Sequence, residues 1–563
     1  MQEEWARIAH RLGGKYPAYV QKIGHLNCKR QLYSLGGIPS GRRALASRVA
    51  IIGAGIGGLA SAALLAARGC DVTVIEKAPQ PGGKARQLIV DGASVDAGPT
   101  VFTLRDVFES IFAECGADLS EYVTVRRASV IARHAWDADR QLDLHADPAR
   151  SEEAIGDFAG AEAAAGFRKF RAEAARIHGI LDQPMMRGSK VSWPLPLMWR
   201  IGLWRMGDLL AIRPYESMWK VLGEHFADQR LRQLFARYST YCGSSPFETP
   251  ATLMLVAHVE AQGVWLIDGG MSALAGALMR LAQMHGAKFR FGTGAALIEA
   301  AQGRASGVIL STGERIGADA VIANADPEAL AAGRFGPLAA MAVSSHGPRK
   351  RSLSAMVWLA HTRTTGFPLQ RHNVLFSGDY PREFANIAGG APPADPSVYV
   401  CAQDREGGAD VLPGQRERLQ IIVNAPANGD IHSYSDEEKA QCTLAMRRSL
   451  QRCGLELEQD FPHTLLTPNA FESFLPATGG AIYGRASHGW AASFLRQGTR
   501  TRIPGLYCAG GSTHPGAGVP MAALSGRLAT QAVLQDLVSM RKSHPVATAG
   551  GMSMRSATAD ATA

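Results

Sequence analysis

A chain of 563 residues, 46% of them hydrophobic, can bury large cores and is too long for one small domain, so we expect two lobes. The formal net charge of +9 is compatible with an ordinary basic surface and with attraction to an anionic membrane face. We expect no nucleic-acid partner, because the sequence contains no basic block with interleaved aromatic residues and no nucleic-acid motif.

The eight cysteines are not paired at metal-ligand or CxxC spacing. They predict buried small side chains in a reducing compartment and no metal centre. We expect no signal peptide, because the N-terminus lacks an apolar segment ahead of a small-residue cleavage site. No run reaches the roughly 18 apolar residues that cross a bilayer, so we predict a cytoplasmic protein or one bound to a membrane from one side.

Residues 1–47 are basic, contain glycine pairs and show only a weak helical pattern. We interpret them as a weakly ordered extension without function; a membrane-touching arm and translation from an upstream start codon are the alternatives. Order begins directly after them. Val49–Ile52 predicts a buried strand, Leu59–Arg68 a helix and Asp71–Glu76 a second strand. This βαβ unit predicts an α/β domain.

The rest of the chain alternates between helical and strand-like segments. Residues 150–247 predict helices, residues 288–327 strands and residues 351–466 a mixture, followed by a strand at 505–510 and a helix at 519–537. This order predicts a discontinuous cofactor domain, a substrate domain built from insertions into it, and a disordered polar tail. The predicted parts are residues 48–149, 250–345 and 475–538 for the cofactor domain, residues 150–249 and 346–474 for the substrate domain, and residues 539–563 for the tail.

The first motif is the GxGxxG sequence Gly53–Gly58, which lies between a strand and a helix and is followed by an acid, Glu76, at the end of the next strand. Together these three features are typical of a dinucleotide site. Gly53 permits the tight turn, Gly55 lets a pyrophosphate approach the backbone, and Gly58 lets the helix pack on the sheet. The helix N-terminus attracts the phosphates, and Glu76 is expected to accept hydrogen bonds from the adenosine ribose.

The second motif, Pro81–Arg86, places two glycines before Lys84 and Arg86. Beside a bound pyrophosphate or flavin, such backbone fits closely and the two cations offset negative charge. A surface turn with solvated cations is the structural alternative. A simple NAD dehydrogenase needs no such second segment.

The third motif is the glycine-rich stretch Cys508–Met521, in which a strand leads to a loop and a helix begins near Pro520. The N-terminus of such a helix can stabilise negative charge on a reduced flavin, and Gly516 and Gly518 leave room for the ring. A helix cap with a flexible loop is the alternative interpretation.

Together the three motifs resemble the FAD-dependent carotenoid desaturases, which are related in fold to the amine oxidases, and the resemblance runs from about Arg48 to about Leu537. Several further stretches are similar to the hydroxyneurosporene (methoxyneurosporene) desaturases within that family. The extension before Arg48 and the residues Phe247–Thr249 depart from the family pattern. The similar stretches are Arg237–Tyr238, Cys242–Pro246, Gly263–Trp265, Gly269–Met271, Arg371–Val374, Tyr483–Trp490 and Gly510–Pro515, while Thr513–Gly518 resembles the bacterial phytoene desaturases.

This resemblance implies an α/β fold, in which an FAD-binding Rossmann-type domain of the glutathione reductase or amine oxidase kind is interleaved with an α+β substrate domain. It implies 3,4-desaturation of acyclic 1-hydroxy- or 1-methoxycarotenoids, on the way to spheroidene or spirilloxanthin in photosynthetic bacteria. FAD is the one implied redox cofactor, reoxidised by oxygen or a membrane quinone. The expected cofactor-binding residues are Gly53, Ala54, Gly55, Ile56, Gly57, Gly58, Glu76, Lys77, Gly83, Lys84, Arg86, Pro99, Thr100, Gly510, Gly518, Val519 and Met521.

No catalytic base stands out in the sequence. His514 lies in the loop assigned to the flavin and is the candidate for proton transfer; the alternative is a turn residue that hydrogen-bonds backbone. Arg237, Tyr241 and Arg485 either shape the substrate end or are structural.

A carotenoid dissolves in lipid, so the enzyme is expected to take it from the cytoplasmic side of the inner, photosynthetic membrane as a peripheral protein. Indoles and arginines beside apolar residues in one short region suit a bilayer interface, and a packed pair of core helices is the alternative. The residues concerned are Trp193, Trp199, Trp204 and Trp219, the apolar Pro194, Leu195, Leu197, Met198, Ile201, Leu203, Leu209 and Leu210, and the interleaved Arg200, Arg205 and Arg213.

Other functions of the same architecture stay open at this point. They are a phytoene desaturase, a carotenoid isomerase, an amine or amino-acid oxidase, and a non-redox isoprenoid-binding protein of the GDP-dissociation-inhibitor type. The inhibitor type lacks a working flavin site, which the glycine motifs and Glu76 argue against. The exact carotenoid, the number of double bonds introduced and the oligomeric state are not predicted.

Overall fold

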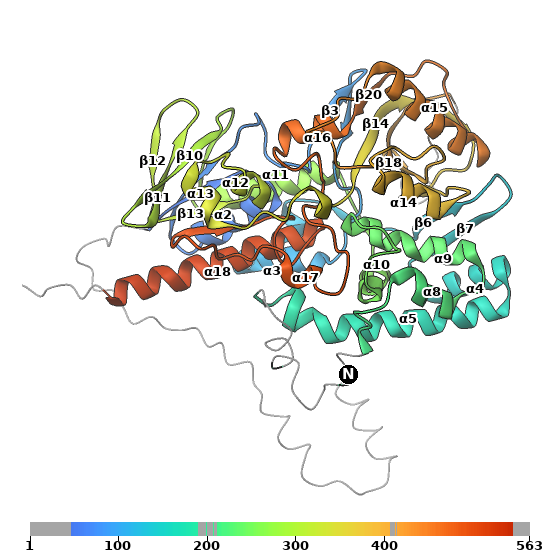
Figure 1. Ribbon diagram of the computed structural model, residues 1–563, viewed down its shortest axis with the longest axis horizontal. Helices are drawn as coiled ribbons and strands as arrows, with labels where there is room; N and C mark the ends of the chain where they lie inside the picture. The colour runs from blue at the N-terminus through green and yellow to red at the C-terminus, as the bar shows by residue number, and fades with distance from the viewer. Residues whose placement is uncertain are drawn as a thin grey trace, which may run out of the picture. The chain divides into compact units, whose positions relative to one another are not determined.

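The computed structural model describes residues 47–189, 199, 207, 211–405, 411 and 414–543 (Figure 1). The described residues from Ser47 onward belong to one compact unit. The predicted extension before Ser47 and most of the predicted tail lie outside the described residues. So do all but three of the residues proposed for the membrane contact, Trp199, Arg213 and Trp219.

A parallel sheet of five strands draws its strands from the beginning, the middle and the end of the chain. The first strand, β1, pairs with β2 on one side and with β13 on the other, and β9 and β21 form the edges. The apolar run in β1 is buried throughout, as expected for a parallel strand covered on both faces. The bounds are β1 Arg48–Ile52, β2 Asp71–Ile75, β9 Lys288–Arg290, β13 Ala320–Ala323 and β21 Leu506–Cys508.

Helix α2 (Ile56–Ala66) follows β1 and is buried at every residue. It packs against α11 (Gly270–Met284) and α18 (Val519–Ser543), which runs beside it in Figure 1. The contact with α18 is close, because a β-carbon added to Gly526 would lie 2.2 Å from the Gly57 carbonyl oxygen. The first and last helices of this layer are therefore in backbone contact.

A second sheet of seven strands has the order β20-β14-β18-β17-β16-β6-β7. Its two longest strands, β14 and β18, pair antiparallel over nine residues each, from Ser354 opposite Ala425 to Thr362 opposite Glu417. The hairpin β6–β7 belongs to the segment predicted for the cofactor domain, yet β6 pairs with β16 of this sheet. The bounds are β6 Val130–Ala135, β7 Gln141–His145, β14 Ser354–Thr362, β16 His372–Leu375, β17 Val398–Ala402, β18 Glu417–Ala425 and β20 His463–Leu466.

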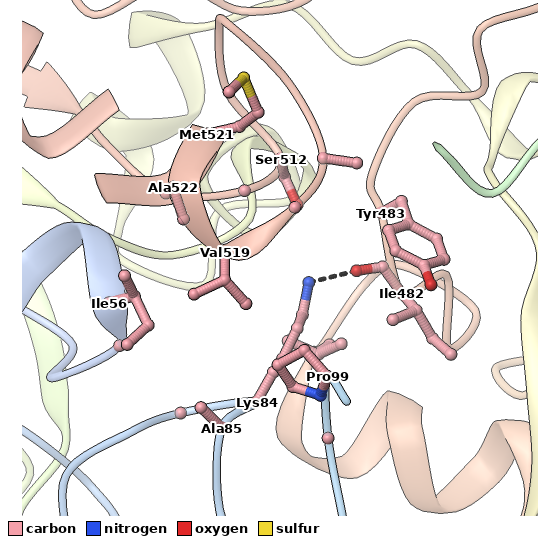
Figure 2. A pocket seen from close by; sticks show the side chains of 18 of the residues that line it. Ile56, Lys84, Ala85, Pro99, Ile482, Tyr483, Ser512, Val519, Met521 and Ala522 are labelled. Carbon is pink, nitrogen blue, oxygen red and sulfur yellow. Dashed lines mark hydrogen bonds between the residues drawn. The ribbon is translucent and has the colours of Figure 1, made fainter. Parts of the chain in front are cut away.

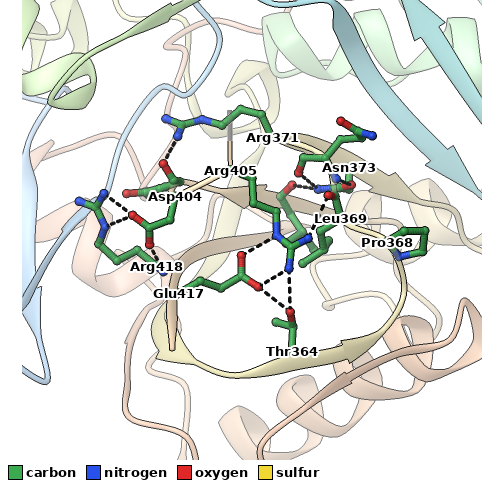
Figure 3. Close-up of polar contacts among 12 residues, drawn as sticks. Thr364, Pro368, Leu369, Arg371, Asn373, Asp404, Arg405, Glu417 and Arg418 are labelled. Atoms are coloured by element: carbon green, nitrogen blue, oxygen red, sulfur yellow. Dashed lines mark hydrogen bonds and ion pairs between the residues drawn. The ribbon is translucent and has the colours of Figure 1, made fainter. Parts of the chain in front are cut away.

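An ion-pair cluster ties the loop after β17 to the start of β18 (Figure 3). Arg405 donates to the Glu417 carboxylate at 2.8 Å, and Thr364 donates to the same carboxylate at 2.5 Å. Arg405 also donates to the Leu369 carbonyl oxygen. Because Glu417 is buried, these donors supply the hydrogen bonds that water would otherwise give its charge.

A layer of helices follows β7 in the chain. The periodicity of residues 150–247 predicted helices in this part of the sequence. The first helix of this layer, α4, begins with Pro148 after Asp147, whose side chain accepts the Ala149 N–H at 2.9 Å. Phenylalanines from α5, α9 and the end of α8 stack in its core, with ring centroids 4.6 Å apart for Phe170 and Phe235. The bounds are α4 Pro148–Ala159, α5 Ala161–Leu181, α8 Met218–His225, α9 Gln229–Ala236 and α10 Leu255–Gln262.

The remaining elements connect or flank these layers. None of the helices in the described ranges combines the length and apolarity that crossing a membrane requires. The seven cysteines among the described residues are free thiols, four of them buried. The remaining bounds are β3 Gln87–Val90, β4 Ala93–Asp96, β5 Val125–Arg127, β8 Trp265–Ile267, β10 Ala295–Ala301, β11 Arg304–Leu310, β12 Arg315–Gly317, β15 Thr364–Gly366, β19 Leu455–Leu457, α3 Arg105–Glu114, α12 Pro327–Ala331, α13 Pro337–Ala342, α14 Tyr380–Ala388, α15 Asp436–Arg452, α16 Pro468–Phe474 and α17 Ala492–Leu495.

Candidate cofactor and substrate site

One large cavity of about 1120 Å³ is lined by residues of both major sheets and of the helical layer. Of the residues predicted to bind the cofactor, all but Ala54 and Gly58 line it. The lining residues of that set are Gly53, Gly55, Ile56, Gly57, Glu76, Lys77, Gly83, Lys84, Arg86, Pro99, Thr100, Gly510, Gly518, Val519 and Met521.

The loop between β1 and α2 has the steric properties expected of its glycines. Gly53 adopts a φ of +96° and donates its N–H to the Ile75 carbonyl oxygen at 2.7 Å. A β-carbon added to Gly58 would lie 2.1 Å from the Gly53 carbonyl oxygen, so the position admits only glycine. Gly55 caps α2 without a side-chain hydrogen bond, and the first turn of the helix lines the cavity. Its amides are therefore suited to an anionic group.

Glu76 lies just beyond the carboxyl end of β2, and only 8% of it is exposed. One carboxylate oxygen accepts the Ala54 N–H at 2.7 Å and the other accepts the Ala78 N–H at 2.9 Å. Each oxygen keeps a lone pair for a further donor. Ala54 thus contributes to the site by holding Glu76, although it does not line the cavity.

The second motif lies against the first. Gly82 donates its N–H to the Ala54 carbonyl oxygen at 2.8 Å, and a β-carbon on Gly83 would lie 3.2 Å from the Gly55 α-carbon. In Figure 2 the Lys84 ammonium points across the cavity and donates to the Ile482 carbonyl oxygen, and burial lowers the pKa of Lys84. These contacts confirm that the two glycine motifs are neighbours in space.

The other two cations of this region contact Phe474. The guanidinium carbon of Arg86 lies 3.8 Å from the centre of the Phe474 ring, and burial lowers the pKa of Arg86. The Lys77 ammonium donates to the Phe474 carbonyl oxygen at 3.2 Å. Both side chains are thus held by α16 while they line the cavity.

The C-terminal glycine motif lies against the first one, and the three glycine motifs together form the part of the cavity that we call the glycine cradle. A β-carbon on Gly57 would lie 2.9 Å from the Gly510 α-carbon and 2.9 Å from the Ala522 carbonyl oxygen. Gly518 precedes α18 with a φ of +110°, and Val519, at the start of α18, lines the cavity opposite Ile56 of α2 (Figure 2). Helices α2 and α18 therefore both begin at this cavity, where the partial positive charge of each N-terminus can act on a ligand. Side chains larger than glycine at the contact between their loops would clash with the neighbouring backbone.

His514 does not belong to the set of residues that line the cavity. It is 2% exposed, and its Nε2 lies 2.9 Å from the Gly188 carbonyl oxygen. This placement agrees with the alternative interpretation of His514 as a turn residue that contacts backbone.

Two further residues belong to the cradle but were not predicted from the sequence. Asn324, directly after β13, donates its side-chain amide to the Gly53 carbonyl oxygen at 3.2 Å and lies beside Gly55 and Gly57. Arg496 is buried and donates to the Tyr483 carbonyl oxygen at 2.9 Å. A polar residue at the carboxyl end of a parallel strand is a usable signal for Asn324, whereas no local pattern marks Arg496.

The rest of the cavity is predominantly apolar, although polar side chains also line it, among them Arg237, Tyr241, Tyr399, Gln420 and Asn424. Arg237 and Tyr241 are two of the predicted substrate-end residues. Arg485, the third, lines a separate cavity of about 650 Å³ instead. The apolar lining includes Leu181, Met185, Leu253, Val256, Val259, Val357, Val374, Phe376 and Ile422.

The site suits a dinucleotide with a flat ring. The two helix starts can receive its anionic parts, Glu76 can accept from hydroxyl groups, and the glycines that meet at Gly55, Gly57 and Gly510 leave the room that β-carbons would fill. Nowhere in the described ranges do three potential metal-ligating side chains gather at one point.

Comparison with known proteins gives consistent matches over most of the chain. The family model for flavin containing amine oxidoreductases matches residues 56–534. The chain is 49% identical to a hydroxyneurosporene desaturase of Rubrivivax gelatinosus over 516 residues, which is 91% of this chain and 98% of that protein. It is 44% identical to a hydroxyneurosporene desaturase of Cereibacter sphaeroides over 88% of this chain and 99% of that one.

More distant relatives and solved structures also match most of the chain. A zeta-carotene-forming phytoene desaturase of Myxococcus xanthus is 30% identical over 86% of this chain and 94% of its own. Among solved structures, an oxidoreductase from Methanosarcina mazei has a TM-score of 0.54 at 18% identity, covering 87% of this chain and 100% of that chain. A putrescine oxidase has a TM-score of 0.53 at 16% identity, covering 88% and 99% of the two chains. These two structures support the fold alone.

Proposed function

This chain belongs to the flavin-containing amine oxidoreductase family, and we propose that it is an FAD-dependent desaturase that introduces a C-3,4 double bond into acyclic 1-hydroxy- or 1-methoxycarotenoids. The identities of 49% and 44% to hydroxyneurosporene desaturases support this substrate class over the phytoene desaturases, which match at 30%. The fold neighbours among amine oxidases reflect the shared architecture.

The observation that carries the proposal is the continuity of the cavity. The glycine cradle and a predominantly apolar region belong to one space of about 1120 Å³. A polyene has no polar groups along its conjugated chain, so an apolar wall can bind it and exclude water from the reacting carbons. An amine or amino-acid substrate would be expected to need a small polar pocket.

We assign to FAD those predicted cofactor residues that line this cavity, apart from Thr100, whose hydroxyl is assigned to the substrate below. The first-turn amides of α2 would hold the diphosphate, Glu76 would accept from the ribose hydroxyls, and the start of α18 would face the isoalloxazine ring. Bound FAD supplies a hydride acceptor for carbon–hydrogen oxidation. The side chains of the apolar wall orient the polyene against it and keep water out.

We further propose that the protein takes its substrate from the cytoplasmic face of a membrane and passes electrons to oxygen or a quinone. Exposed aromatic side chains support the membrane contact: Trp199 is 70% exposed, Tyr215 is 72% exposed, and the Tyr215 ring lies 5.8 Å from that of Trp490. Trp219 does not contribute to this surface, because it packs on Phe247 with ring centroids 5.0 Å apart.

Expression in a host that accumulates 1-hydroxyneurosporene tests the reaction. We expect a product with one more conjugated double bond, identified by chromatography and a longer-wavelength absorption spectrum. Accumulation of unchanged substrate beside a flavin-containing protein would contradict the proposal, and turnover of phytoene instead would support the phytoene desaturase alternative. Purified protein without yellow flavin absorbance would favour the non-redox isoprenoid-binding alternative.

A further inference from the structure

A buried ion pair interrupts the apolar wall of the cavity. Arg237 and Glu260 both line the cavity, their side chains are 4% and 3% exposed, and they approach to 2.9 Å. Tyr241 donates to one Glu260 oxygen at 3.0 Å, and Tyr238 donates to the other. Burying two charges beside a hydrocarbon-binding space is costly, and a pair of apolar residues would line that space as well.

This pair has no hydrogen-bonding capacity left for a ligand. The four lone-pair positions of Glu260 are taken by two contacts from Arg237 and one from each tyrosine. Arg237 directs its Nε to His134 at 3.0 Å and its remaining N–H groups to Glu260 and the tyrosines. The ion pair therefore acts as a fixed support, and any ligand contact must come from a neighbouring group.

The neighbouring group is a short hydrogen-bond chain that ends at the cavity. The Tyr399 hydroxyl lies 2.7 Å from Thr100 Oγ1 and 2.7 Å from His372 Nδ1. Thr100 and Tyr399 line the cavity, whereas His372 lies behind them and is 2% exposed. The hydrogen-bond chain and the ion pair line the same cavity.

The protons of this chain can be placed by elimination. Burial, together with the charges of Arg371 and Arg237, lowers the pKa of His372 to about 3, so the imidazole is neutral and carries one proton. Its buried Nε2 has no hydrogen-bond partner among the described residues. A buried N–H is rarely left unpaired, so the proton belongs on Nδ1 and is donated to Tyr399. A Tyr399 hydroxyl that accepts from His372 can donate to Thr100 across their 2.7 Å contact, which leaves the Thr100 proton for another acceptor.

We propose that Thr100 and Tyr399 form a subsite that binds the oxygen on C-1 of the carotenoid, with the Thr100 hydroxyl as donor. This proposal rests on the function proposed above and identifies how the substrate is positioned. An alcohol and a methyl ether both offer an accepting oxygen, whereas the hydrocarbon would leave the Thr100 hydroxyl unpaired beside an apolar ligand. Only C-2 separates C-1 from C-3, so fixing the oxygen also fixes which bond is presented for oxidation.

The test compares three substrates on the flavin-loaded full chain: 1-hydroxyneurosporene, its methyl ether, and neurosporene, which lacks the oxygen. The unaltered protein is expected to prefer the alcohol and the ether over the hydrocarbon in kcat/KM. Tyr399→Phe removes one hydroxyl from the chain and should reduce that preference by about 3- to 10-fold, the size of one uncharged hydrogen bond. Thr100→Val should reduce it at least as much.

Tyr380→Phe is the matched control, because Tyr380 also lines the cavity but packs among aromatic rings, 5.1 Å from Phe384. It should leave the preference as in the unaltered protein. Equal losses on all three substrates in Tyr399→Phe, or no preference in the unaltered protein, would overturn the subsite. If the unaltered protein turns over none of them, the proposed function fails separately. Quenching of flavin fluorescence by the same carotenoids then decides the subsite: a preference that Tyr399→Phe reduces supports it, and equal affinities overturn it.

Discussion

The Glu76 carboxylate connects the two N-terminal glycine motifs, because it accepts the N–H of Ala54 in one loop and of Ala78 just before the other. A carboxylate can accept both amides and still accept from a ribose, whereas an amide side chain offers only one accepting atom. This explains why an acid at the end of the second strand accompanies a GxGxxG turn.

Glu76→Gln should therefore weaken FAD binding. One of the two backbone N–H groups would face an NH₂ group, and the expected loss is about 1–3 kcal/mol, or roughly a 5- to 150-fold increase in Kd. Titration of the apoprotein with FAD, followed by flavin fluorescence, measures it. Glu314→Gln is the control, since Glu314 pairs with Arg290 at the surface. Equal affinities in all three proteins would refute the role of Glu76.

Glu383 gives a pH-dependent contribution to stability. Burial raises its pKa to about 7, although hydrogen bonds from Ser397 oppose the shift. Between the ordinary carboxyl pKa and about pH 7, the folded state holds a proton that the unfolded state has lost, so the free energy of unfolding decreases as pH rises through this range. The whole effect is roughly 3 kcal/mol.

Glu383→Gln should remove this contribution, because glutamine does not ionise. We expect the variant to gain stability relative to the unaltered protein as pH rises from about 5 to about 7, and to keep a constant difference above that range. Chemical denaturation at several pH values measures the difference. A difference that is independent of pH would show that Glu383 titrates normally.

Among the elements, α2 depends most on small residues. Its N-terminal glycines admit the loop of Gly510 and the start of α18, and Ser61 donates its hydroxyl to the Gly526 carbonyl oxygen at 3.0 Å. Helix packing at this distance leaves no space for β-carbons. The glycines at Gly57 and Gly58 allow close contact with neighbouring loops, although glycine has a lower intrinsic helix propensity than alanine.

Gly57→Ala should destabilise the protein by about 1–3 kcal/mol, because its β-carbon would meet the backbone of Gly510 and Ala522. Gly179→Ala in α5 is the matched control, since nothing lies within 4 Å of its added β-carbon. There we expect a gain of about 0.5–1 kcal/mol from helix propensity. Thermal unfolding and bound flavin are the measurements, and equal behaviour of the two variants would contradict the packing argument.

At the scale of the whole molecule, the parallel sheet, the seven-stranded sheet and the helical layer all contribute walls to one cavity. Substrate from a membrane must enter this cavity past an exposed surface. Tyr215 lies between α5 and α8 and Trp490 precedes α17, so two distant parts of the chain bring aromatic rings together at the surface. Such rings are favoured at the headgroup level of a bilayer.

Replacing Tyr215 and Trp490 together by serine should therefore reduce flotation of the protein with anionic liposomes. Ile431→Ser is the control, because Ile431 is also exposed, at 84%, but lies between β18 and α15. A deletion of residues 199–213 should release the protein further. Unchanged flotation in the double variant would place the membrane contact elsewhere, while loss of flotation in Ile431→Ser would indicate general instability.

The strands and helices of the βαβ unit were predictable because their signals are local. Val49–Ile52 lies within β1 and Asp71–Ile75 forms β2, as the apolar runs indicated. The helix was predicted from Leu59 but begins at Ile56, because its first glycines are held by contacts with other loops and not by their own propensity. The three glycine motifs were likewise readable, since turn sterics limit which residues can occupy them.

The sequence by itself determined the flavoprotein family, the glycine loops and the acid at Glu76, because these depend on spacing along the chain. Only the tertiary structure decided which distant residues meet. It placed Gly57 against Gly510, Asn324 beside the first loop, the β6–β7 hairpin in the second sheet, and the buried His514 against the Gly188 carbonyl oxygen. Contacts between residues hundreds of positions apart follow from how whole layers pack, and no short pattern of residues encodes that packing.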